Sequence, residues 1–147
     1  MIPTSISDQG RLMHTIKPTP SVVMDVADVV MEEYDAGVAS YWREGSSVLL
    51  QVSSHRRTSG EQVGASRRLE ARLDRENLAD VRLEAIEIAS CPDIAAASGV
   101  DSESIRWYYI YAVWADLMLF ITVSGEECEL DVNGAWAFES IRTARRA

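Results

Sequence analysis

Alternating apolar and polar positions predict two β-hairpins. In the first, residues 38–43 and 48–54 are strands joined by a Glu44–Ser47 turn that contains a glycine. In the second, residues 104–114 and 117–124 are rich in aromatic and β-branched side chains, which favour pleated, half-buried strands. These are the strongest strand signals in the chain.

A helical period in the apolar residues predicts three helices. Residues 25–34 place three valines on one face and acidic side chains opposite them. A helix over residues 59–77 begins with Ser59 and Gln62, a pair that satisfies unpaired backbone N–H groups at a helix start. A C-terminal helix is expected over residues 134–145, with arginines near its negative end.

The remaining segments give weaker signals. Residues 1–20 contain three prolines and no period, so irregular structure is expected there. Residues 80–89 are a predicted strand whose apolar phase slips, as a bulge near Ala85 would cause. Residues 94–97 suit a short strand or a helical turn, and residues 126–131 suit an acidic loop.

The order of these elements predicts the fold class. Strands follow one another through hairpins while helices are grouped apart, which is typical of an antiparallel sheet covered by helices. We therefore expect an α+β fold with an α/β/α sandwich-like arrangement. Without an internal repeat or a linker, residues 21–147 are interpreted as a single domain after the irregular segment 1–20.

The charge is strongly negative and unevenly distributed. The net charge is −9, although residues 56–75 carry six arginines against three acidic residues. A nucleic-acid-binding protein must neutralise backbone phosphates, so an acidic body argues against a nucleic-acid ligand. A partner protein of basic character fits this charge better.

The start of the chain and its cysteines suggest a compartment. No basic leader with an apolar run is visible, and Cys91 and Cys128 are the only cysteines. A cytoplasmic location with reduced thiols is therefore expected. Residues 107–123 carry one charge, at Asp116, and reach the shortest length that spans a bilayer as a helix. Their composition favours two strands, so we expect no membrane insertion.

No group of residues predicts catalysis or a metal site. His14 and His55 lack a nearby motif that supplies both a nucleophile and an orienting carboxylate, so no enzyme activity is expected. The Cys and His residues lack the close spacing of zinc ligands. Residues 129–134 resemble part of a calcium loop, but Glu129 and Ser140 do not suit its first and twelfth positions. We therefore expect no metal and no cofactor.

Arginines gather on one face of the second predicted helix. Arg68, Arg72 and Arg75 stand at i, i+4 and i+7 and so share that face. They form either a solvated face with internal pairs such as Arg72 with Glu76, or an anchor for an acidic patch on a partner.

Aromatic side chains occupy both faces of the strand over residues 104–114. Trp107, Tyr109 and Tyr111 lie on one face, and Tyr108 lies on the other with Ile110. One face must cover the core. The other either packs under helices or forms a surface for a partner or ligand.

The order of elements also matches a known arrangement. The features that carry the match are the hairpin 42–54, the helix 60–77, the hairpin 106–124 and a closing helix with Trp136, Phe138 and Ser140–Ile141–Arg142. Over about residues 25–147 the chain resembles the PsbP/DcrB-like α/β/α sandwich domains. That resemblance implies a binding module, such as an adaptor, an assembly factor or an effector-loading chaperone of a bacterial secretion system.

The sequence thus favours a non-catalytic protein-binding module: an adaptor, a secretion-type chaperone or an immunity-type inhibitor of a basic toxin. Its candidate partner-binding residues are Arg68, Arg72, Arg75, Trp107, Tyr109 and Tyr111. The alternative is a small-molecule or lipid-binding domain with a pocket against the aromatic sheet face. A homodimer is compatible with either function.

Overall fold

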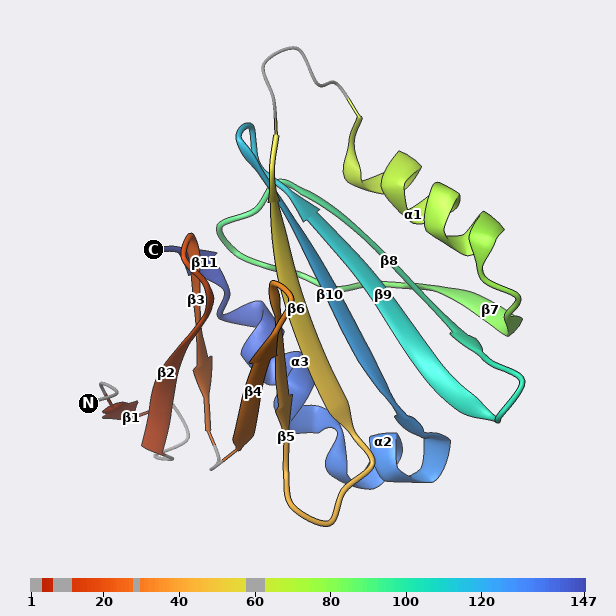
Figure 1. The fold of residues 1–147 in the computed structure, drawn as a ribbon, viewed down its shortest axis with the longest axis horizontal. Coiled ribbons are helices and arrows are strands. Elements are labelled where there is room, and N and C mark those ends of the chain that lie inside the picture. Colours follow the sequence, from red (N-terminus) through yellow and green to blue (C-terminus); the bar gives the residue numbers. More distant parts are fainter. Residues whose placement is uncertain (1–3, 7–11, 28–29, 58–62) are drawn as a thin grey trace.

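The computed structural model describes residues 4–6, 12–27, 30–57 and 63–147. Within these residues, the chain forms two antiparallel sheets and three helices (Figure 1). The larger sheet has the spatial order β4 (Met31–Asp35), β5 (Val38–Trp42), β6 (Leu49–Arg56), β10 (Leu117–Glu126), β9 (Ile105–Val113), β8 (Asp93–Val100) and β7 (Ala79–Glu84). The smaller sheet has the order β1 (Thr4–Ile6), β2 (Leu12–Thr19), β3 (Val22–Val26) and β11 (Arg145–Arg146). The helices are α1 (Ala65–Arg75), α2 (Glu127–Asn133) and α3 (Ala135–Arg142).

Strands β9 and β10 form the centre of the larger sheet. They pair without a register shift from Met118 opposite Val113 to Glu126 opposite Ile105. The backbone N–H of Trp114 donates to the carbonyl of Leu117 at 2.8 Å and closes the turn between them. Because side chains alternate along a strand, this fixed register determines on which of the two faces of the sheet each residue of β9 lies.

Two hydrophobic cores lie on opposite faces of the larger sheet. Helix α1 buries Ala65 and Leu69 against Tyr109 and Tyr111 of β9, and Figure 1 shows it beside β8 and β9. The other core includes residues of the sheet such as Ile110, together with residues of α3 and β3. Burial of one such apolar side chain stabilises a fold by about 2 kcal/mol, so both faces contribute.

The predicted α+β class is confirmed, and so are both predicted hairpins. The helix predicted for residues 25–34 is wrong, because β3 and β4 occupy that region. Val22, Met24 and Val26 are buried at alternate positions, which is the period of a strand. Asp25 lies between them and accepts a hydrogen bond from Thr15 of β2 at 3.0 Å.

Irregular structure is also a wrong prediction for residues 12–19, which form β2. The prolines that argue against a strand are tolerated there. The pairing of β2 with β3 shifts register between Ile16 and Thr19, and Pro18 lies inside that shift. Proline has no backbone N–H to donate, so an irregularity in the ladder accommodates it.

The second predicted helix is shorter than expected. Helix α1 begins at Ala65 with Gly64 at its N-cap position and ends at Arg75. The predicted capping pair, Ser59 and Gln62, lies outside the described residues. The ambiguous residues 94–97 belong to strand β8.

Three further boundaries differ from the sequence pattern. The register shift in β7 lies between Ala79 and Arg82 rather than near Ala85, and the strand ends at Glu84. The acidic loop predicted for residues 126–131 is mostly helix α2. Helix α3 ends at Arg142, because the two arginines beyond Ala144 pair with β3 as strand β11. In the part of the chain that the structure describes, no helix is long and apolar enough to span a bilayer.

Candidate functional site

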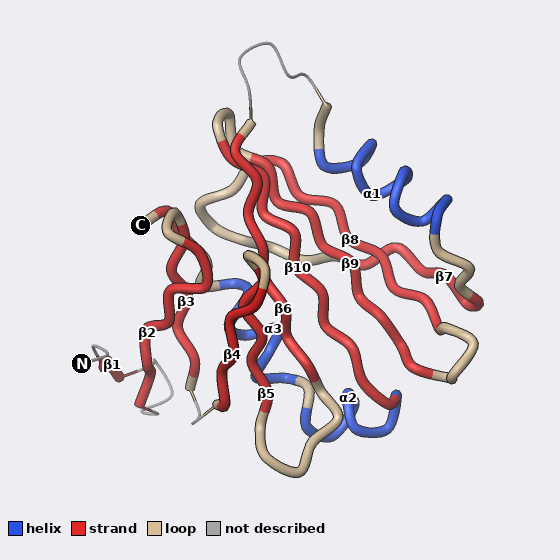
Figure 2. The backbone as a smooth tube through the Cα atoms, viewed as in Figure 1, coloured by secondary structure: helices blue, strands red, loops and turns tan. Residues whose placement is uncertain are grey.

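A groove with a volume of about 580 Å³ lies against the face of the larger sheet that α1 partly covers. Helix α1 contacts β8 and β9, while β5 and β6 lie further along the sheet (Figure 2). The helix therefore leaves β5 and β6 uncovered, and the groove lies between the helix and this uncovered part of the sheet. Side chains from the helix, the strands and the β8–β9 turn line it, among them Gln51, Arg72, Glu76, Trp107, Tyr109 and Thr122.

A row of polar side chains crosses three adjacent strands; Gln51 and Thr122 of this row line the floor of the groove, and Ser40 lies next to them outside the lining. The Gln51 amide nitrogen donates to the Ser40 hydroxyl at 3.2 Å. The Thr122 hydroxyl donates to the Gln51 amide oxygen at 3.5 Å. Ser40, Gln51 and Thr122 are directly opposite one another in the strand register, so the pairing of β5, β6 and β10 builds this row. The floor thus presents hydroxyl and amide groups.

Aromatic rings continue the floor beyond Thr122. Tyr109 is opposite Thr122 in register, and its ring is stacked on Phe120 with centroids 6.3 Å apart. Trp107 is stacked on Tyr109 at 6.1 Å. The Trp107 indole N–H donates to a carboxylate oxygen of Asp101 at 2.9 Å, which fixes the ring orientation. Flat rings next to hydrogen-bonding groups are typical of binding sites for organic ligands and side chains.

Arg72 of α1 forms the helical wall of the groove. Its guanidinium carbon lies 4.7 Å from the centre of the Phe120 ring, within the range of a cation–π contact. The same group donates to the Tyr111 hydroxyl at 3.2 Å and lies 3.5 Å from a carboxylate oxygen of Glu76. The Arg72 and Glu76 side chains remain 28% and 35% exposed, so both are accessible from the groove.

The ionisation of two groups in the groove follows from their contacts. The indole of Trp107 and the backbone N–H of Ile105 lower the pKa of Asp101, whose carboxylate they stabilise. Burial raises the pKa of Tyr109 to about 12, so its phenol is neutral at pH 7. Among the described residues that line the groove, Arg72 supplies the basic side chain, and Glu76 and Asp101 supply carboxyl groups.

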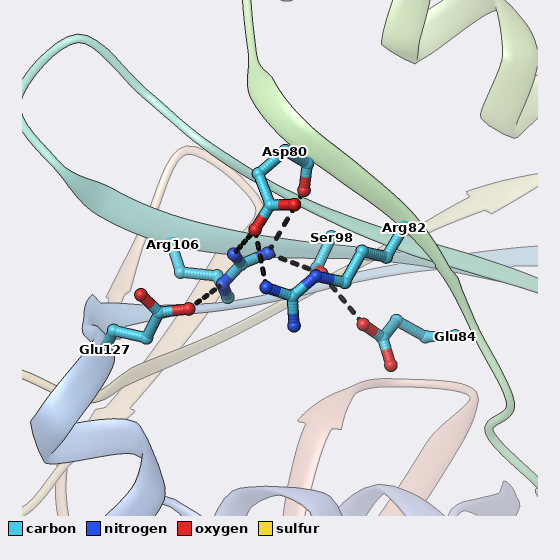
Figure 3. Close-up of polar contacts among 6 residues, drawn as sticks. All are labelled: Asp80, Arg82, Glu84, Ser98, Arg106 and Glu127. Atoms are coloured by element: carbon cyan, nitrogen blue, oxygen red, sulfur yellow. Dashed lines mark hydrogen bonds and ion pairs between the residues drawn. The ribbon is translucent and has the colours of Figure 1, made fainter.

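A second polar cluster lies on the opposite face of the sheet around the buried Arg106, whose side chain is 3% exposed (Figure 3). Arg106 is 2.6 Å from a carboxylate oxygen of Asp80 and 2.8 Å from one of Glu127. It also donates to the Ser98 hydroxyl at 2.9 Å, and Ser98 donates to Glu84 at 2.8 Å. The cluster joins β7, β8, β9 and α2.

This cluster has a structural explanation. Asp80 has a φ of 49°, in the left-handed region that aspartate tolerates better than most residues. It lies in the register shift of β7, and Arg106 holds both its carboxylate and, at 3.5 Å, its backbone carbonyl. Arg82 and Arg106 lower the pKa of Asp80 by hydrogen bonds to its carboxylate. Arg106 therefore anchors the irregular start of β7 to the sheet.

The two cysteines and residues 129–134, which the sequence analysis considered as metal ligands, have the following surroundings in the structure. Cys91 is buried and Cys128 exposed, and burial raises the pKa of the Cys91 thiol. Glu129 accepts a hydrogen bond from the Asn133 side chain at 2.9 Å, so two candidate calcium ligands contact each other within α2. Among the described residues, no group of three or more His, Cys, Asp or Glu side chains is placed to hold a metal ion.

No protein-family model matches the chain, and the search of curated proteins found no match.

The structure places three of the six candidate residues from the sequence in the groove and three outside its lining. Arg72, Trp107 and Tyr109 line the same groove. Tyr111 is buried beneath Arg72, and its hydroxyl is the hydrogen-bond partner of that arginine. Arg68 is half-buried and Arg75 is exposed; neither lines the groove.

The polar floor was not among the candidates. Gln51 and Thr122 carry no motif, and they become neighbours only through strand pairing. The alternation of polar residues with buried Leu50 and Val52 in β6 was the available signal for their common face.

Proposed function

We propose that this chain is a non-catalytic binding module that holds a basic, extended segment of a partner protein along the open part of the larger sheet. A side chain of that segment occupies the groove between Arg72 and the polar floor. The observation that carries the proposal is the continuity of this groove with an acidic strand at the edge of the same face. The proposal covers an adaptor, a secretion-type chaperone and an immunity-type inhibitor.

The acidic edge is strand β4. Glu33 is opposite Ser40 in register, and Ser40 accepts a hydrogen bond from Gln51 of the groove floor. Directly opposite residues project to the same face of a sheet, so Glu33 and, two positions on, Asp35 lie on the groove side. All five residues of β4 are exposed. A lysine or arginine of a bound segment would therefore meet carboxylates at β4, as well as Glu76 and Asp101 at the groove.

Two attributes of the proposal come from the sequence. The resemblance to PsbP/DcrB-like α/β/α sandwich domains supports a binding role, since members of that family act as adaptors and chaperones. The position of α1 on one face of the sheet and of α3 against the other is compatible with that arrangement. A cytoplasmic location is proposed with it, supported by cysteines that are both free.

The test uses two adjacent glutamates on opposite faces of β4. Peptides are selected from a random display library, and the binders are mapped on the ¹⁵N-labelled protein by NMR. We expect basic peptides that shift the signals of Gln51, Trp107 and Thr122. Glu33→Lys should weaken their binding roughly tenfold through like-charge repulsion, which corresponds to about 1.4 kcal/mol.

Glu32→Lys is the matched control, because it makes the same charge change on the other face of the same strand. If both variants weakened binding equally, the change in the net charge of the protein would explain the effect, and this result would contradict the proposed site. Selection of acidic peptides, or of peptides that bind outside the groove, would overturn the proposal.

The groove volume also supports a second candidate, a small-molecule ligand, because about 580 Å³ lies within the usual range for such sites. Native mass spectrometry of the protein purified from its own host tests this. A small ligand would add a discrete mass that Thr122→Trp removes by filling the floor, whereas Glu33→Lys leaves it in place, since Glu33 does not line the groove.

A further inference from the structure

The two end strands of the larger sheet differ in charge. Strands β4 and β7 each pair on one side only within that sheet. An unpaired edge presents backbone N–H and C=O groups that can pair with another chain. Strand β4 carries Glu32, Glu33 and Asp35 among its five residues, so a second copy of β4 would bring like charges together. Strand β7, with the sequence Ala-Asp-Val-Arg-Leu-Glu, has no such concentration of one charge.

Strand β7 also exposes apolar surface. The Leu83 residue is 84% exposed, the highest fraction among the large apolar residues that the structure describes, and Val81 is 49% exposed. Leu83 is opposite Ala97 of β8 and lies on the face of the sheet that α1 contacts, yet the helix does not cover it. Charged residues usually protect an edge strand, so an exposed leucine one residue before the end of β7 requires an explanation.

The residues on either side of Leu83 are complementary to their own copy. In an antiparallel pair of two β7 strands centred on Leu83, Arg82 of one copy is directly opposite Glu84 of the other, and the reverse pair forms as well. Directly opposite residues project to the same face, with Cβ atoms about 5 Å apart. The two leucines meet at the symmetry axis. Val81 stands opposite Ala85, the first residue after β7, so the two strands themselves overlap over Arg82, Leu83 and Glu84.

The edge is held in an extended form. Arg106 binds the carboxylate of Asp80, which in turn contacts Arg82, and Ser98 binds Glu84. The two charged side chains of the complementary pair are therefore positioned by the sheet beneath them. Arg82 remains 57% exposed, so it is accessible to a carboxylate from outside.

We infer that β7 pairs with the β7 of a second copy of this chain about a two-fold axis at Leu83, which joins two seven-stranded sheets into one. The pair is isologous, because the same patch meets itself. One strand pair buries less surface than a standard protein interface, so the dimer is weak and concentration-dependent. This inference does not rest on the proposed function, since Leu83 does not line the groove.

Sedimentation equilibrium of the full chain, at concentrations up to about 1 mM, tests the association. The unsubstituted protein should show a reversible monomer–dimer equilibrium. Leu83→Lys places two lysines opposite each other at the axis and should raise the dissociation constant roughly tenfold or more. Val132→Lys is the matched control, because Val132 is a 77% exposed apolar residue on α2, and it should leave the equilibrium unchanged.

Disulfide trapping gives the geometry. In a Cys128→Ser background, which removes the exposed thiol, Leu83→Cys should form a symmetric disulfide dimer under mild oxidation, and Val132→Cys should not. A chain that stays monomeric at the highest concentration overturns the inference. So does a dimer that Leu83→Lys leaves intact, because that dimer uses another surface. Equal weakening by both lysine variants would also overturn the inference, because loss of exposed apolar surface at either place, and not the β7 edge in particular, would then control association.

Discussion

Arg72 donates a hydrogen bond to the hydroxyl of Tyr111 across the interface between α1 and the larger sheet, over a distance of 3.2 Å. The arginine comes from the helix that carries the wall of the groove, and the tyrosine comes from the central strand β9. Because Tyr111 is buried, its hydroxyl depends on this donor for the hydrogen bond. The contact therefore fixes the position of the groove wall relative to its floor.

Replacement of Arg72 by alanine should lower the free energy of unfolding by about 1 to 2 kcal/mol, through loss of this hydrogen bond and of the cation–π contact with Phe120. Arg75→Ala is the matched control on the same helix, and it should change stability by less than about 0.5 kcal/mol because Arg75 is exposed. Urea unfolding measures both. An equal effect of the two substitutions would contradict a specific role of Arg72.

Replacement of Arg106 by methionine should cost more, about 2 to 3 kcal/mol, because it removes charge-assisted hydrogen bonds that hold the irregular start of β7. Arg82→Met is a sharp control, since Arg82 contacts the same carboxylate of Asp80 but is 57% exposed. Its expected effect is below about 0.5 kcal/mol. A loss in Arg106→Met no greater than in the control would show that Asp80 does not depend on the buried arginine.

The raised pKa of Tyr109 predicts how the free energy of unfolding changes at high pH. Burial raises its pKa to about 12, above the value of about 10 in an unfolded chain. The folded state therefore keeps a proton that the unfolded state loses. The stabilisation by Tyr109 is complete below pH 10 and is lost as the pH rises toward 12, with a total change of about 2 kcal/mol.

Unfolding curves between pH 8 and about 12 measure this change. Tyr109→Phe should reduce the pH dependence, since phenylalanine has no proton to lose. A pH dependence that is the same in Tyr109→Phe as in the unsubstituted protein would show that Tyr109 does not titrate in this range.

The sequence pattern was sufficient where strands face two different environments. In β9 the predicted alternation of Tyr109 and Tyr111 with Tyr108 and Ile110 is confirmed, because each set contacts a different core. The aromatic and β-branched composition of β9 and β10 reflects the same burial on both faces. Strong local preference and tertiary environment agree in these strands.

The sequence pattern did not identify elements whose residues are all, or nearly all, exposed, because such elements show no alternation of buried and exposed positions. Every residue of β4 is exposed, so its sequence, Met-Glu-Glu-Tyr-Asp, shows no alternation that would identify a strand. In α2 only Leu130 is buried, and an acidic segment with one buried residue is hard to distinguish from a loop. Both elements are determined by their neighbours, not by their own periodicity.

The groove could be predicted only in part. Trp107 and Tyr109 were candidates because they share a face, and Arg72 because it belongs to an arginine face. That α1 stops short of β5 and β6, and so leaves Gln51 and Thr122 in the lining of the groove, depends on how the helix packs across the sheet. A single sequence contains no local signal for that position.

The smaller sheet links segments far apart in the chain. Arg145 contacts the carboxylate of Asp25 at 3.1 Å, from a position 120 residues away, and β11 pairs directly with β3. Closing so long a loop carries an entropic cost that must be met before the contacts form. We therefore expect this sheet to assemble late in folding, after the β9–β10 hairpin, and its amide hydrogens to exchange with solvent faster than those of the central strands.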